Sequence, residues 1–217
     1  MTATPTDIEF DRQIGALTEA GYPGLTGLSD DDFAAALEPL RAVVLAHQES
    51  AADQGEDHIP FVLVVARTAQ GASIDAHEAM SRTALGTQPG FADFEPAELA
   101  RFRPVESVEI PDGIGYALMN VDTGSEYLNV TPATALASLT ELGRTGLTVA
   151  EGIALITVRP DMLRKNKCFS LLSSRCGDKR VPALWISQRR PKLGWCWNGN
   201  PHTWLGSAST AGRVPLP

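Results

Sequence analysis

The sequence predicts an α+β domain in which N-terminal helices cover a mixed or antiparallel sheet that ends in a Trp-rich C-terminal β-meander. Three observations support this class: capping motifs mark several helix starts, two apolar runs have the length of buried strands, and the last fifty residues alternate like short strands. A chain of 217 residues has room for one compact domain or two small ones. We expect an N-terminal helical segment at 1–50, an α+β core at 59–209 and a tail at 210–217.

Helix starts are marked by Ser or Thr followed three residues later by an acid, or by Thr followed by Pro. These motifs begin at Thr6, Ser29, Thr131 and Thr148. The helices expected from them lie near 6–20, 30–48, 132–143 and 148–158.

Two strands are expected between these helices, at the near-continuous apolar run 59–66 and at 114–121. The acidic stretch 49–58 is typical of a solvated loop, and a helix is predicted within 74–85. The long connection 86–104 carries three phenylalanines, which suits either a lid or a surface loop packed onto the body.

The C-terminal meander, at 168–209, allows a prediction of register. Its strands are expected near 168–173, 181–187, 193–197 and 203–208. If Ser187 pairs with Leu193 across a five-residue turn, Trp185 lies opposite Trp195. If Trp197 then pairs with Thr203, the fourth strand lies beside the third.

This register predicts two apolar faces. The first carries Trp185, Leu193, Trp195, Trp197 and Leu205. The second carries Leu184, Ile186, Gly194, Cys196, Trp204, Gly206 and Ala208, with Asn198 and His202 at its rim. The small residues on the second face would let another backbone, a helix or a ligand approach closely, and a slip of one residue would exchange the two faces.

Charge is divided along the chain. Residues 1–158 hold 7 basic against 24 acidic residues, a net of −17, whereas residues 159–217 hold 11 basic against 2 acidic residues, a net of +9. The basic segment could bind an acidic partner or nucleic acid, or it could pack against the acidic part of its own chain. The overall charge of −8 would repel a polyanion from a distance, so nucleic acid is the less favoured partner.

Three kinds of chemistry are open to the C-terminal residues. Cys168, Cys176, Cys196 and His202 have the donor set of a Cys₃His zinc site, but they lack the paired Cys-x-x-Cys spacing, so we predict no metal and no cofactor. His202 lies diagonal to Cys196 in the predicted register, which makes a catalytic Cys–His dyad geometrically feasible.

The third kind is a small-molecule pocket. Asn198, Asn200 and His202 concentrate donors and acceptors beside Trp204, as ligand sites do, although Asn-Gly and Asn-Pro are also ordinary turn residues. His202 would serve as hydrogen-bond partner or general acid/base. Arg189 and Lys192 would contact an anionic group of the ligand.

The composition excludes other classes. With 43% hydrophobic and 20% charged residues, the chain is neither collagen-like nor disordered, and its longest apolar runs are far shorter than a membrane span. No export leader opens the chain, and 3 cysteines, an odd number, suit reduced thiols. We therefore expect a soluble, cytoplasmic protein.

The C-terminal segment at 168–209, with its string Gly-Trp-Cys-Trp-Asn-Gly-Asn-Pro-His-Thr-Trp-Leu-Gly-Ser-Ala-Ser, resembles the signature of an uncharacterised actinobacterial protein family. The segments 120–124 and 147–155 resemble its more central parts. The resemblance implies a bacterial cytoplasmic setting and assigns no activity to any residue.

Two functions from different classes follow from these observations. The first is a small-molecule-binding protein or an enzyme of specialised metabolism, with its site at the Trp, Asn and His residues of the last strands. The alternative is a non-catalytic interaction protein that binds an acidic partner through its basic segment. The sequence determines neither the oligomeric state nor whether the protein is an enzyme.

Overall fold

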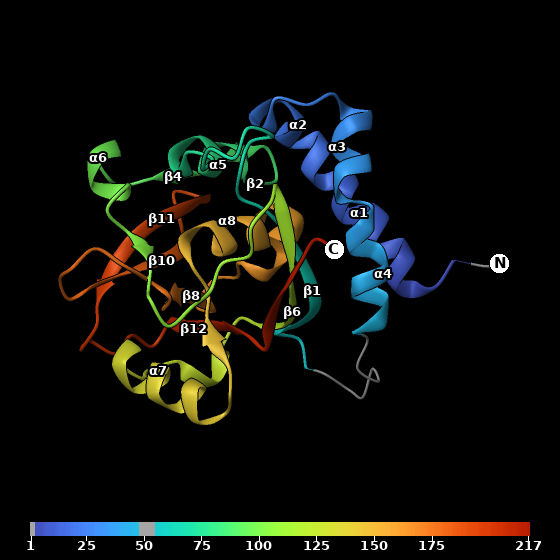
Figure 1. The fold of residues 1–217 in the computed structure, drawn as a ribbon. Coiled ribbons are helices and arrows are strands. Elements are labelled where there is room, and N and C mark those ends of the chain that lie inside the picture. Colours follow the sequence, from blue (N-terminus) through green and yellow to red (C-terminus); the bar gives the residue numbers. More distant parts are fainter. Residues whose placement is uncertain (1–2, 48–54) are drawn as a thin grey trace.

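The computed structural model describes residues 3–47 and 55–217 and confirms the α+β class (Figure 1). The helices are α1 Pro5–Glu19, α2 Tyr22–Thr26, α3 Asp30–Leu37, α4 Pro39–Ala46, α5 Ala76–Arg82, α6 Pro96–Leu99, α7 Pro132–Glu141 and α8 Val149–Val158, with 3-10 turns η1 Ser125–Tyr127 and η2 Pro160–Met162. The strands are β1 His58–Val65, β2 Ala84–Leu85, β3 Gln88–Pro89, β4 Phe91–Ala92, β5 Arg103–Pro104, β6 Gly115–Asp122, β7 Thr145–Gly146, β8 Cys168–Leu171, β9 Ser174–Arg175, β10 Arg180–Ser187, β11 Arg190–Trp197, β12 Leu205–Thr210 and β13 Gly212–Pro215.

The capping motifs account for most helix starts. The side chains of Ser29, Thr131 and Thr148 each accept a hydrogen bond from the backbone N–H three residues on, as N-caps do. The first helix begins earlier than expected, because Thr4 rather than Thr6 is its cap. The predicted helix at 30–48 is two helices, α3 and α4, because Pro39 has no N–H with which to continue the first. Residue 48 and most of the predicted loop at 49–58 lie outside the described residues.

The main sheet runs in the order β1-β6-β12-β8-β10-β11-β4, with β13 also paired to β6 and β7 to β12. The two apolar runs predicted as strands form its antiparallel β1–β6 pair. The predicted tail at 210–217 is not a tail, since β13 pairs with β6 from Gly212↔Met119 to Pro215↔Tyr116.

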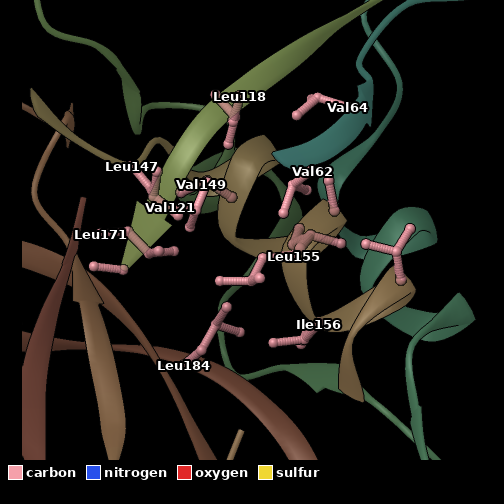
Figure 2. Close-up of a cluster of buried hydrophobic side chains, with 14 of the residues drawn as sticks. Val62, Val64, Leu118, Val121, Leu147, Val149, Leu155, Ile156, Leu171 and Leu184 are labelled. Atoms are coloured by element: carbon pink, nitrogen blue, oxygen red, sulfur yellow. The ribbon is translucent and has the colours of Figure 1, made fainter. Parts of the chain in front are cut away.

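Helix α8 is buried against this sheet and also contacts helices α1 and α5. Figure 2 shows Leu155 and Ile156 of α8 between Val62 of β1 and Leu184 of β10, two strands that three others separate in the sheet order. Such a helix must be apolar on nearly all sides, as α8 is. At about 25 cal/mol per Å² of apolar surface buried, a fully buried Leu or Ile contributes roughly 1.5–3 kcal/mol to stability.

The N-terminal helices share this core and lie beside β1 and β6 (Figure 1). Phe10 of α1 stacks on Phe61 of β1 with ring centroids 6.4 Å apart. The buried Gln13 side chain donates to the Phe61 carbonyl and accepts from the Leu63 N–H, at 2.9 and 2.8 Å. Gln13 therefore satisfies backbone groups on the edge strand β1 that would otherwise be unpaired.

The connection at 86–104 is packed onto the body. Its strand β4 pairs with β11, and Phe94 packs edge-on against Phe102 at 5.3 Å. These contacts favour a packed surface loop over a lid.

No helix in the described parts of the chain is both long and apolar enough to cross a membrane.

Candidate functional site

The β10–β11 hairpin has a different register from the predicted one. Ser187 pairs with Arg190, so the turn holds two residues, Gln188 and Arg189, with φ of 53° and 61°. Positive φ at both positions is typical of the type I′ turn, whose twist matches that of the flanking strands. The predicted five-residue turn is therefore wrong, and Trp185 faces Lys192 rather than Trp195.

The shift is an odd number of residues, so it exchanges faces as a one-residue slip would. Ala183 pairs with Gly194, which places Trp185, Gly194 and Cys196 on one face. The predicted face that joined Trp185 to Trp195 is therefore wrong. A Cβ on Gly194 would lie 2.2 Å from the Trp185 ring, so the missing side chain is what lets this indole lie against the strand.

The last long strand also differs from the prediction. β12 pairs in parallel with β8, not with β11, so the predicted pairing of Trp197 with Thr203 does not form. Gly206 is the small residue that lets another backbone approach, because a Cβ there would lie 2.2 Å from the Gly124 carbonyl oxygen.

The segment 198–204 crosses from β11 to β12 and is held by backbone hydrogen bonds. Ala133 N–H donates to the Asn198 carbonyl at 3.1 Å, Asn129 N–H to His202 at 2.8 Å, and Cys168 N–H to Trp204 at 3.0 Å. This crossing, rather than strand pairing, brings His202 and Trp204 to the β10–β11 hairpin.

A cavity of about 290 Å³ opens where the crossing segment meets the hairpin, and we call it the indole cavity. It is lined by Trp185, Trp195, Cys196, Trp197, Asn200, His202, Trp204 and Leu205. All 4 tryptophans of the chain therefore line one cavity. Four of the residues proposed from the sequence, Cys196, Asn200, His202 and Trp204, are brought together here.

The rings meet at steep angles. Trp185 packs edge-on against Trp204 with centroids 6.0 Å apart, and Trp195 against Trp197 at 4.8 Å. The His202 ring lies 5.3 Å from that of Trp204, tilted by 46°. Edge-to-face aromatic pairs of this kind contribute about 0.5–1.5 kcal/mol beyond burial, so they help to hold the walls in place.

Cys196 is poorly suited to act as a nucleophile. Burial raises the pKa of its thiol, and the opposing effects of Ser170 and Arg175 do not cancel that shift. Its sulfur lies 3.7 Å from the Ser170 hydroxyl, and no hydrogen bond to His202 is found in the part of the chain that the structure describes. A protonated thiol is unreactive, so Cys196 serves as a small apolar part of the cavity wall.

Lys192 and Arg189 do not line the cavity. The Lys192 ammonium is paired with Asp93 at 2.6 Å and lies 5.2 Å from the Trp185 ring centroid. Arg189 is exposed in the turn at the opposite end of the hairpin from the crossing segment. These two residues are therefore not placed to contact an anionic group of a ligand in the cavity.

A second cation stands against the Trp195 wall. The Arg180 guanidinium carbon lies 5.6 Å from the Trp195 ring centroid, and Arg180 also pairs with Glu98 and Asp178. Hydrogen bonds from Arg180 hold the pKa of the Asp178 carboxyl well below its usual range.

Asn198 lies at the base of the crossing segment and does not line the cavity. Its N–H donates to the Lys179 carbonyl at 2.8 Å and its carbonyl accepts from Ala133. Its side-chain oxygen is buried without a hydrogen-bond partner. Asn198 thus anchors the segment, while Asn200 reaches the cavity.

The zinc alternative gains no support. The Cys168 thiol donates to the Arg164 carbonyl and the Cys176 thiol to Asp178, at 3.4 and 3.2 Å. Across residues 3–47 and 55–217, no group of three or more His, Cys, Asp or Glu side chains could hold a metal ion.

Several cations of the basic segment are paired within the chain. The pairs that join residues 159–217 to acids of residues 1–158 are Arg164 with Glu56 and Asp57, Lys167 with the same two acids, Arg180 with Glu98, Lys192 with Asp93, and Arg213 with Glu151. This pattern favours the intramolecular interpretation of the divided charge.

The site residues that the sequence did not assign are Trp185, Trp195, Trp197 and Leu205. The predicted five-residue turn puts Trp185 on the face opposite Cys196. Trp195 and Trp197 flank Cys196 on β11, so strand alternation places them on the opposite face in either register and gives no sign that they line the same cavity. Neither Gln188 nor Arg189 is a residue type that favours positive φ, so the two-residue turn carried no sequence signal.

Comparison with known proteins adds a family. The chain matches a family of unknown function, DUF5701, over residues 16–216, and it belongs to that family. No curated protein and no solved structure matches it. The matched range includes every residue that lines the indole cavity.

Proposed function

We propose that this member of DUF5701 binds a small molecule in the indole cavity. The observation that carries the proposal is that all 4 tryptophans line one open space of about 290 Å³. Ligand sites are concave and mostly apolar, with a few polar groups that fix orientation, and this volume is close to the lower end of their usual range.

The cavity offers a ligand both kinds of contact. The indoles and Leu205 supply apolar walls, while Asn200 and His202 supply hydrogen-bonding groups at the crossing segment. Trp197 is 46% exposed, so a ligand that covers its ring would remove apolar surface from water.

The same geometry limits catalysis. A thiolate mechanism through Cys196 is disfavoured by its raised pKa and its contact with Ser170. If the protein is an enzyme, His202 is the lining residue whose chemistry suits proton transfer to a bound substrate.

An interaction protein that binds an acidic partner is the competing function. The ion pairs within the chain leave fewer free cations for such a partner, which supports the cavity instead. Salt dependence separates the two, because a polyanion complex loses affinity steeply between low and moderate salt and a small uncharged ligand does not. The setting that we propose, from the sequence resemblance alone, is the cytoplasm of an actinobacterium.

The test uses three naphthalene probes that differ in charge: 2-naphthol, 2-naphthoate and N,N,N-trimethyl-2-naphthylammonium. We expect at least one to bind saturably by calorimetry. Trp197→Ala should weaken that probe at least about tenfold, since the ring is a cavity wall. Leu142→Ala is the matched control, because Leu142 is also exposed, at 65%, but lies at the end of α7.

Two results would end the proposal. One is the absence of saturable binding by all three probes. The other is binding that survives unchanged in both Trp197→Ala and His202→Ala proteins that remain folded.

A further inference from the structure

Two walls of the indole cavity already carry a cation from the chain itself. The Lys192 ammonium lies 5.2 Å from the Trp185 ring centroid, and the Arg180 guanidinium carbon lies 5.6 Å from that of Trp195. Both distances are within the roughly 6 Å at which a cation is attracted to an aromatic ring. Aromatic walls with no cation against them would favour a cationic ligand. Because Lys192 and Arg180 already lie against two of these rings, the cavity loses that preference for cations.

A cationic ligand meets two obstacles here. Its charge would lie close to those of Lys192 and Arg180 on rings that these cations already engage. No carboxylate stands among the lining residues to compensate, and the nearby acids Asp93, Glu98 and Asp178 are paired with the two cations.

An anionic ligand meets different ones. The faces of the indoles are the negative part of their quadrupole and repel an anion. No Lys or Arg stands among the lining residues, so an anion would lose its hydration without gaining an ion pair. Arg175 affects the Cys196 thiol but does not line the cavity.

We propose that the indole cavity selects an uncharged aromatic molecule that carries a hydrogen-bonding group. The ring packs among the indoles, and the polar group bonds Asn200 or His202. This inference rests on the proposed function, since it names the ligand class of the same cavity.

The naphthalene probes test the charge selection directly, because they share one ring system. We expect 2-naphthol to bind at least about fivefold more tightly than either charged probe. Tighter binding of the trimethylammonium or the carboxylate probe would overturn the inference while leaving the proposed function standing. Failure of all three to bind would overturn the proposed function itself.

A variant identifies the cause of the selection. Lys192→Met keeps an unbranched apolar side chain against Trp185 and removes its charge. The affinity of the trimethylammonium probe relative to 2-naphthol should rise about two- to fivefold, the size of an exposed cation–π contact. Arg189→Met is the matched control, because it removes a cation of the same hairpin for which the structure shows no ring contact, and the ratio should stay unchanged. Equal ratios in wild type and Lys192→Met would refute this origin of the selection.

Discussion

The core around α8 and the indole cavity are built on the same sheet, and two neighbouring residues of β10 show the contrast between them. Leu184 and Trp185 are consecutive residues of β10, so they point to opposite faces. Leu184 is fully buried toward α8 (Figure 2), whereas Trp185 is only partly buried and lines the cavity. Around α8 aliphatic side chains exclude water, whereas the rigid ring of Trp185 on the opposite face borders an open space.

The contrast predicts that changes in the core around α8 alter stability and that changes in the cavity lining alter binding.

The largest loss of stability is expected from breaking the buried ion pair that joins β13 to α8. Arg213 of β13 makes hydrogen bonds to both carboxylate oxygens of the fully buried Glu151, at 2.6 and 2.8 Å. Arg213→Met would leave that charge buried without its partner, at a cost of about 3–5 kcal/mol in the free energy of unfolding. Chemical denaturation measures the loss, and the double variant with Glu151→Gln should recover part of it. A loss below about 1 kcal/mol would contradict the prediction.

The adjacent pair on β10 gives the sharpest comparison. Leu184→Ala should cost about 2–5 kcal/mol of stability, because it opens a void in the core, yet leave binding of 2-naphthol nearly unchanged. Trp185→Ala should weaken that binding at least about tenfold. Its cost in stability should be smaller, because the indole is partly exposed already. The contrast between the two faces fails if both variants change the same property.

Gln13→Leu tests the edge of the sheet at the N-terminal helices. The variant removes both hydrogen bonds to β1 and leaves buried backbone groups of Phe61 and Leu63 unpaired. We expect a loss of about 1–3 kcal/mol in thermal or chemical denaturation and no change in probe affinity. Gln13→Glu is less suitable as a test because it would also bury a charge.

The smallest effect concerns the thiol of Cys196, whose pKa is raised by burial. Its alkylation by iodoacetamide near pH 8 should be slower than that of a free thiol. The same shift contributes stability that is present below the thiol's unfolded pKa and is lost as the pH rises through the folded pKa. Mass spectrometry of labelled peptides measures the rates. Rapid labelling of Cys196 at neutral pH in folded protein would contradict its assignment as an inert wall residue.

Local signals in the sequence were enough for the fold class. The Thr148–Glu151 capping box and the apolar run at 59–66 depend on neighbouring residues, and both are found as expected. Two features were not accessible in this way. The turn at Gln188–Arg189 uses residues that rarely adopt positive φ, and the parallel pairing of β12 with β8 joins segments far apart in the chain.

The candidate site shows a different kind of partial success. Cys196, His202 and Trp204 do line one cavity, as the predicted register required, but the register itself is wrong. Their meeting depends on the crossing segment 198–204, whose anchors on Asn129 and Ala133 lie more than sixty residues earlier in the chain. No local pattern in the last fifty residues could have indicated those anchors.

The gathering of every tryptophan at the indole cavity has a practical consequence for spectroscopy. The tryptophan emission of this protein, excited at wavelengths that tyrosine does not absorb, comes from one place, since all 4 indoles line the same space. Its intensity and wavelength therefore report the occupancy of the cavity without any label, and unfolding elsewhere that leaves the hairpin intact will be nearly silent in that signal.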